Sequence, residues 1–173
     1  MFVKLIDLLS IENWTALENE LHETSGLEVS VFNTEGVRIT DNKGWVNRLC
    51  PVIKANDKGQ AFICAVAHMN IASEALQKRE PVIEECDAGL VKLVVPIIAK
   101  ETFLGSVGAC GLLLEDGEVD SFMVNRTIGI EEEEVEALSG DIGNISRAAA
   151  HALARDIQNK ITRIVAQYET KMS

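Results

Sequence analysis

The apolar positions of this chain follow a helical period first and a strand period afterwards. Between residues 2 and 21, apolar side chains recur every three or four positions, which predicts two N-terminal helices. Ser10 is suited to cap the start of the second helix, and Gly26 is suited to end it. The period then changes to two over residues 27–32 and again over residues 37–40, on either side of a turn sequence. This second pattern predicts a β-hairpin.

Helical patterns return after the hairpin and are followed by three further strand patterns. We expect one helix near residues 45–53 and a longer one over residues 60–78. Three runs rich in β-branched residues, each bounded by turn signals, then predict strands. They cover residues 82–86, 91–98 and 104–114. A final helical pattern follows the acidic stretch 131–134 and reaches about residue 170.

Two hairpin strands, a helical insert and three sequential strands define an α+β architecture. This is the layout of PAS-like folds, which enclose a small ligand between one sheet face and the inserted helices. We therefore expect a PAS-like five-stranded antiparallel sheet with inserted helices, N-terminal helices and a long C-terminal helix. In this scheme residues 1–130 form the sensory domain, and residues 131–173 form a helical extension for dimerisation and signal transmission.

The final helix carries one apolar stripe along an otherwise polar surface. Its members are Leu153, Ile157, Ile161, Ile164 and Tyr168. A compact domain has few other helices to cover the distal turns of such a stripe, so we expect an equivalent helix of a second copy to cover them. The sequence therefore predicts a homodimer, with the alternative that the stripe packs on the domain's own sheet.

Charge narrows the range of partners. The chain of 173 residues has 16 Lys and Arg against 27 Asp and Glu, a net charge of −11. This negative field repels nucleic acid and anionic membrane surfaces, so we expect neither as a partner. The N-terminus does not have the regions of a signal peptide, and no apolar stretch approaches the roughly 20 residues of a membrane span. We therefore expect a cytoplasmic protein, in which thiols stay reduced.

Four cysteines raise the question of metal binding. None of them forms a close C-x-x-C pair, so the plainest interpretation is that the thiols pack as small apolar groups. The alternative is a metal site at Cys50, Cys64, His68 and Cys86, because Cys64 and His68 lie one helical turn apart. The cofactor is accordingly unknown: none, zinc, or an iron–sulfur cluster completed by Cys110.

A catalytic cysteine is a third interpretation of the same residues. It would need a general base nearby. The chain has three histidines, and none of them stands in a recognisable catalytic motif. We therefore expect a protein that is not an enzyme.

Four segments carry a likeness to a known family. They are Trp45 through Cys50, Cys64 within its helix, Cys86-Asp87-Ala88-Gly89-Leu90 followed by Val95-Pro96-Ile97, and Leu104-Gly105 leading to Gly108 and Gly111. Together they resemble the PocR sensory domain, a PAS-like module of bacterial and archaeal signal transduction, over roughly residues 10 to 125. Two positions depart from the family's pattern: Asp87 stands where His is frequent, and Cys110-Gly111 stands where Gly-Gln is frequent.

The resemblance implies a sensory function. It places a small-molecule ligand in a pocket between the sheet and the inserted helices. The residues expected to line that pocket are Trp45, Cys50, Cys64, His68, Cys86, Asp87 and Gly89. The departures imply a ligand different from the simple hydrocarbon derivatives, such as small diols, that the family is thought to sense. The signalling output would belong to a separate protein or to a longer chain; the alternative function is a redox sensor with a cysteine-ligated metal or iron–sulfur cluster.

Overall fold

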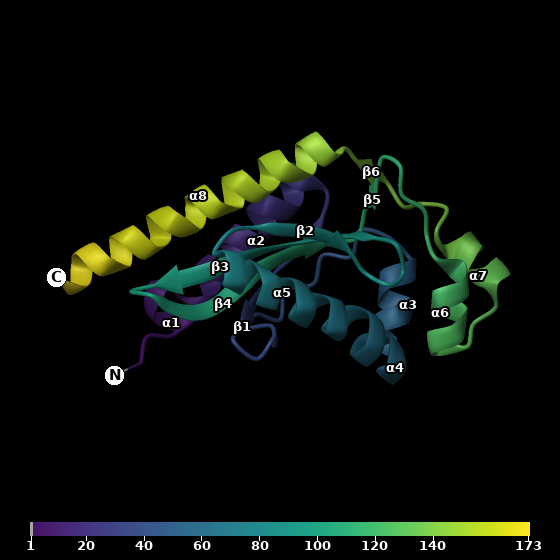
Figure 1. The fold of residues 1–173 in the computed structure, drawn as a ribbon, viewed down its shortest axis with the longest axis horizontal. Coiled ribbons are helices and arrows are strands. Elements are labelled where there is room, and N and C mark those ends of the chain that lie inside the picture. The colour runs from purple at the N-terminus through teal and green to yellow at the C-terminus, as the bar shows by residue number, and fades with distance from the viewer. Residues whose placement is uncertain (1) are drawn as a thin grey trace.

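The computed structural model describes residues 2–173, whose centre is a four-stranded antiparallel sheet. Its spatial order is β1–β4–β3–β2. The strands are β1 (Glu28–Asn33), β2 (Val82–Glu85), β3 (Val91–Ala99) and β4 (Thr102–Cys110). Figure 1 shows the sheet between the long helix α8 on one side and α5 on the other. The predicted α+β class, antiparallel sheet, inserted helices and long C-terminal helix are confirmed.

Helices precede the sheet, interrupt it and follow it. The first are α1 (Leu5–Leu8) and α2 (Ile11–Ser25), and the insert between β1 and β2 contains α3 (Leu49–Ala55), α4 (Asp57–Gly59), the π-helix η1 (Gln60–Ala65) and α5 (Val66–Lys78). After β4 come β5 (Leu113–Leu114), α6 (Ser121–Ile128), α7 (Glu132–Leu138), β6 (Asn144–Ile145) and α8 (Arg147–Met172). The strands β5 and β6 pair in parallel as a separate small sheet. Across residues 2–173, every helix is too short or too polar to cross a membrane.

The caps of α2 are those that the sequence predicts. The Ser10 side chain accepts a hydrogen bond from the Asn13 N–H, which satisfies one of the free donors at the helix start. Gly26 ends the helix in the left-handed conformation, with φ of 72°. These two caps define the ends of α2, whose apolar side packs on the sheet.

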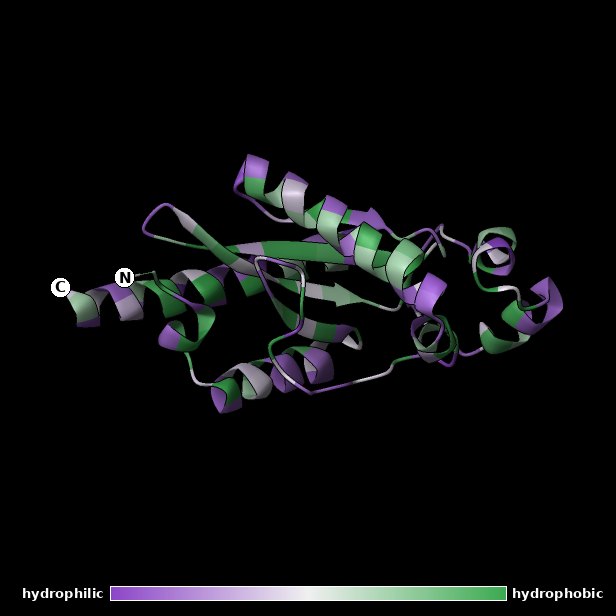
Figure 2. Ribbon diagram, turned by 90° about the horizontal axis from the view of Figure 1, so that it is seen from below, coloured by the Kyte–Doolittle hydropathy of each residue, from purple (hydrophilic) through white to green (hydrophobic). Residues whose placement is uncertain are grey.

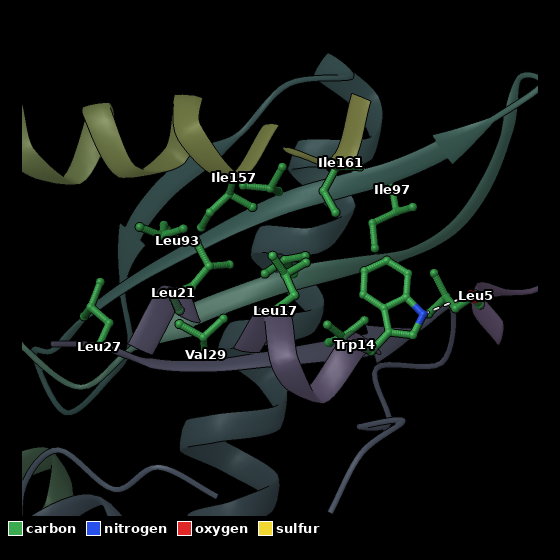
Figure 3. Packing of buried hydrophobic residues seen from close by; sticks show 14 of the residues in the cluster. Leu5, Trp14, Leu17, Leu21, Leu27, Val29, Leu93, Ile97, Ile157 and Ile161 are labelled. Carbon is green, nitrogen blue, oxygen red and sulfur yellow. Dashed lines mark hydrogen bonds between the residues drawn. The ribbon is translucent and has the colours of Figure 1, made fainter. Parts of the chain in front are cut away.

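The two faces of the sheet differ in chemistry because successive side chains of a strand point to opposite sides. We call one side the apolar face. Its side chains are buried and include Val29, Val31, Leu93, Val95, Ile97 and Val107. They pack with Leu17 and Leu21 of α2 and with Ile157 and Ile161 of α8 (Figure 3). Figure 2 shows the central strands largely in the hydrophobic colour, whereas the helices alternate between hydrophobic and hydrophilic residues.

We call the other side the polar face. It carries Glu28, Ser30 and Phe32 of β1, Lys92 of β3 and Ser106 of β4, alternating with the apolar side chains. Only its far end is apolar, where Val82 and Val94 pack against α5. The candidate site described below lies on this face.

The central part of the apolar stripe of α8 packs on the chain's own core. Ile157 and Ile161 are 0% and 5% exposed and belong to the main core, together with residues of α2 and β3. Ala150, Ala154 and Val165 complete the buried line of the helix. Leu153 and Ile164 pack partly buried against the same core, whereas Tyr168 in the distal turns is half-buried outside it, so the homodimer stays a prediction.

A fifth strand is not confirmed. Over the predicted strand 37–40, the chain makes one isolated bridge, between Phe32 and Arg38. The reason is the buried carboxylate of Glu18, which is 1% exposed. It accepts hydrogen bonds from the Val31 N–H (2.9 Å) and from the Thr40 hydroxyl (2.9 and 2.8 Å). Glu18 thus occupies the backbone donor that a longer hairpin would use.

Glu18 ties α2 to the edge of the sheet, so its removal should destabilise the fold. We expect Glu18→Ala to lower the free energy of unfolding by about 2 kcal/mol or more, because two buried donors lose their acceptor. Urea denaturation followed by circular dichroism measures this change. Glu23→Ala, on the exposed side of the same helix, is the control and should have little effect. Equal stability of the two variants would contradict this role of Glu18.

Candidate ligand-binding site

A cavity of about 410 Å³ lies between the polar face of the sheet and the helical insert. We call it the main cavity. It is lined by Phe32, Gly36, Arg38, Lys43, Trp45, Pro51, Lys54, Ala55, Gln60, Cys64, Ala65, His68 and Lys92. Its volume lies within the range of about 300–1,000 Å³ that is typical of small-molecule sites. Both the predicted helical insert and the strand alternation therefore contribute to one enclosed space.

The strand register arranges the side chains on the polar face next to the main cavity. Glu28 of β1 and Lys92 of β3 both pair with Cys110 of β4, so the three side chains form one row across the sheet. Gly108 lies two residues along β4 and leaves space above the sheet. A Cβ atom there would lie 2.9 Å from Phe32 Cε2 and 3.5 Å from His68 Nδ1. The missing side chain thus lets the two rings lie over the strand.

His68 of α5 is buried, at 3% exposed, and stacks on Phe32 with ring centroids 3.8 Å apart. Its Nε2 lies 3.4 Å from the Ser106 hydroxyl. Its Nδ1 has no hydrogen-bond partner among residues 2–173. Burial, followed by the positive charges of Lys92, Lys54 and Arg38, lowers the pKa of His68 to about 3. The wall of the main cavity therefore holds a neutral imidazole with one unpaired nitrogen.

Charged side chains surround this imidazole. Glu28 is 2% exposed and pairs with Arg38 at 2.5 Å and with Lys54 Nζ at 3.6 Å. The Lys54 Nζ also lies 5.2 Å from the centre of the Trp45 ring. Lys92 is 6% exposed, and its Nζ lies 5.7 Å from the centre of the Phe32 ring. The arrangement combines cationic donors with aromatic faces, the pattern of cation–π contacts.

A second, much smaller cavity of about 30 Å³ adjoins the main one, with Lys54, Cys64 and Lys92 lining both. We call it the thiol cavity. Its lining includes Cys50, Cys64, Cys86 and Cys110, together with Ile53, Ile63, Ala88 and Leu90. All four cysteines are free thiols. The sequence separation between these residues is large, and the register and the insert bring them to one place.

Burial governs the chemistry of the thiols. It is the largest cause that raises the pKa of Cys64, to about 11, and it also raises the pKa of Cys50 and of Cys86. The Asn47 amide donates to Cys50 Sγ at 3.3 Å, and the opposing effect of this bond on the Cys50 pKa is smaller than that of burial. Protonated thiols are weak nucleophiles. Burial therefore makes Cys50, Cys64 and Cys86 poor nucleophiles, and they line a largely apolar pocket.

The predicted metal site at Cys50, Cys64, His68 and Cys86 is not supported. Within the described part of the chain, no group of three or more His, Cys, Asp or Glu side chains is placed to hold a metal ion. The physical reason is that His68 lines the main cavity, where it contacts Phe32 and Ser106, whereas Cys50 and Cys86 line the thiol cavity.

The residues expected to bind the ligand fall into three places. Trp45 and His68 line the main cavity, Cys50 and Cys86 line the thiol cavity, and Cys64 lines both.

Asp87 and Gly89, the remaining two, lie in a separate open hollow of the surface, with Cys86, Glu118 and Asp120. Gly89 has φ of 90°, and a Cβ atom there would lie 2.1 Å from the Glu118 carbonyl oxygen. This position therefore requires glycine, because the backbone of Glu118 lies too close for any side chain.

Sequence reasoning missed the cationic lining of the main cavity: Arg38, Lys54 and Lys92. One signal was present for Lys92, which is the single charged residue in the apolar run of β3. The alternation of Glu28, Ser30 and Phe32 was a second signal, because it marks a strand face that is not purely apolar.

A family model for the sensory domain found in PocR matches residues 7–168, nearly the whole chain. The searches of curated proteins and of solved structures gave no match. The matched range includes α2, the helical insert, the whole four-stranded sheet and most of α8. Both cavities therefore lie within it.

His68 should make the stability of the fold depend on pH. The unfolded chain binds a proton on this histidine near pH 6.5, whereas the folded chain resists protonation down to about pH 3. The unfolded state thus binds more protons between these values, so the stabilisation is complete above about pH 6.5 and is lost as the pH falls toward 3. Between about pH 7 and about pH 5 we expect a loss of about 2 kcal/mol from this residue.

Urea denaturation at the two pH values measures the effect. His68→Gln should show a smaller loss of stability on acidification than the wild type. The control is His151→Gln, since His151 is exposed on α8, and it should behave as the wild type does. An unchanged pH dependence in His68→Gln would mean that other groups carry the acid sensitivity.

Proposed function

The chain belongs to the PocR sensory-domain family, and from this premise we propose that it binds a small molecule in the main cavity and passes this event to a signalling partner. One observation carries the proposal. A cavity of about 410 Å³ between the sheet and the helical insert holds two aromatic rings, several donors and an unpaired buried nitrogen of His68. Convergent polar groups in an otherwise apolar hollow are the usual form of a ligand site.

The position of the cavity suggests how binding could be transmitted. Lys92 lines the main cavity from the polar face of β3, while its neighbour Leu93 packs with Ile157 of α8 on the apolar face. A shift of β3 on ligand binding would therefore change the packing of α8. In this proposal residues 1–130 sense the ligand, and residues 131–173 transmit the change through α8.

The π-helix η1 is the second element that such a signal would use. Its wide turns carry Cys64 and Ala65 into the main cavity and continue into α5, which carries His68. π-helical turns are rare and frequently occur at functional sites. We propose that η1 and α5 adjust together when the cavity fills.

The remaining parts of the proposal concern partners and location. The distal turns of α8, where Tyr168 is half-buried, and the exposed Phe2 (91%) and Ile6 (56%) next to the α1–α8 contact support a homodimer. A separate signalling protein would receive the output. The four free thiols support a cytoplasmic location, where cysteines stay reduced. We propose a binding role without catalysis, because burial moves the pKa of His68 and of the Cys50, Cys64 and Cys86 thiols away from neutral pH.

Filling the main cavity should abolish ligand binding. Ala65→Phe places a ring into the cavity, whereas Ala61→Phe makes the same change on the exposed side of η1, outside the cavity lining. A panel of small polar and charged molecules is screened by thermal unfolding of the purified chain. A ligand at 100 times its Kd stabilises the fold by about 2.7 kcal/mol, which raises the melting temperature by several degrees.

The expected result is a shift in the wild type and in Ala61→Phe, and none in Ala65→Phe. A ligand that stabilises all three proteins equally binds elsewhere, which would contradict the assignment of the main cavity.

A further inference from the structure

We propose that the ligand of the main cavity is a small organic anion, whose negative group is held by Lys92 with Arg38 and Lys54. This inference rests on the proposed function and adds the chemical class of the ligand. It is carried by the excess of positive charge in the cavity, by a buried lysine without an anionic partner, and by an unpaired donor position on His68.

The cavity is cationic within an acidic protein. The chain has a net charge of −11, yet Arg38, Lys43, Lys54 and Lys92 all line the main cavity, and among residues 2–173 no carboxylate does. Glu28 lies beside the cavity and pairs with Arg38 and Lys54. One carboxylate leaves an excess of positive charge there. Low-dielectric walls concentrate the field of such a cluster, which attracts an anion from solution.

Lys92 is the strongest single indication. Its side chain is 6% exposed, and no carboxylate in residues 2–173 lies within 4.0 Å of its Nζ. The Phe32 ring, with its centre 5.7 Å away, offers a cation–π contact. A buried charge is costly unless it is paired. An apolar residue would suit β3 better, so the lysine is explained by a partner that arrives with the ligand.

His68 adds a directional contact. The Ser106 hydroxyl can donate to Nε2, which lies 3.4 Å away. When the hydroxyl donates, the ring proton lies on Nδ1, the nitrogen that has no partner. The Nδ1–H is then a buried donor without a partner at the wall of the main cavity, and it becomes available to an anionic oxygen when the adjoining Phe32 ring moves. Lysine, arginine and a neutral imidazole donor together match a carboxylate or a phosphate ester.

The other residues of the site can accommodate the apolar part of an organic anion. The Phe32 and Trp45 rings provide apolar faces in the main cavity, and the thiol cavity of about 30 Å³ lies beyond Cys64. A space that small and apolar admits only a short group such as a methyl. The ligand is therefore a short anion with an apolar end, and a bare inorganic ion would leave this part of the site empty.

Isothermal titration calorimetry of the full chain tests the inference with two organic anions, propionate and methyl phosphate, and two neutral probes, propionamide and 1,2-propanediol. We expect at least one of the two anions to bind saturably at millimolar concentration and at least about tenfold more tightly than either neutral probe. The stronger anion identifies carboxylate or phosphate ester as the head group. Inorganic phosphate is included to show the contribution of the organic part.

Substitutions then assign the binding to the proposed residues. Lys92→Met should weaken anion binding by about tenfold to a hundredfold, the usual loss for a charge-assisted contact. Lys171→Met makes the same change of net charge on the exposed end of α8 and should leave the affinity unchanged. Lys43→Met, at the exposed rim of the cavity, should weaken binding a few-fold without disturbing the core.

A second readout separates a ligand-binding lysine from a structural one. Without ligand, Lys92→Met should melt at a higher temperature than the wild type, because an unpaired buried charge is replaced by an apolar group of similar length. A lower melting temperature would indicate a structural role for Lys92 and count against the inference.

The outcomes distinguish this inference from the proposed function. If a neutral probe binds as tightly as the anions and Ala65→Phe abolishes its binding, the main cavity is the sensory site and the anion assignment is wrong. If no anion binds saturably, or if Lys92→Met and Lys43→Met both bind as the wild type does, the assignment is likewise overturned.

Discussion

A sheet covered by helices on both sides places two demands on each of its strands, because neighbouring side chains must suit two different environments. In this chain β1 and β3 meet both demands by alternation. Val29, Val31 and Leu93 enter the core beneath α2 and α8, while Glu28 and Lys92 enter the space beneath the helical insert. The core can therefore be closely packed without filling the cavity. The position of every group in the site follows from this division between the two faces.

The division between the two faces also explains how buried charged groups are tolerated at the centre of the domain. Glu28 compensates Arg38 and Lys54 at short range, so that most of the buried charge is paired. Among residues 2–173, His68 Nδ1 is the buried side-chain atom that has no hydrogen-bond partner, and the Lys92 ammonium has no carboxylate within 4.0 Å. The unpaired groups at the cavity lower the stability of the fold, and the close packing of the apolar face compensates for this loss.

Local patterns in the sequence predicted local structure well. The Ser10 cap, the Gly26 terminus and the stripe of α8 depend on residues a few positions apart, and the structure contains all three. The sequence of α8 does not indicate which element packs on its apolar side, because that depends on where the sheet lies in the fold. The predicted strand 37–40 was not confirmed for a similar reason: the Val31 N–H donates to Glu18, which lies 13 residues earlier in the chain.

For the candidate site, Trp45, Cys50, Cys64, His68 and Cys86 were chosen from motifs, and they line two adjoining cavities. The cationic lining depends on strand register, which brings Glu28 and Lys92 into one row with Cys110 and cannot be read from spacing.

The contacts of Glu18 have a consequence for behaviour in concentrated solution. An open sheet edge presents unpaired backbone groups on which another chain can add as a strand, the first step of aggregation. Here the outer edge of β1 is occupied by the Glu18 carboxylate at Val31 and by the following turn, whose Val37 carbonyl accepts from the Asn33 N–H. The opposite edge, β2, is four residues long and ends in the exposed pair Glu84 and Glu85. Both margins of the sheet thus discourage strand addition, one by internal capping and the other by brevity and like-charge repulsion.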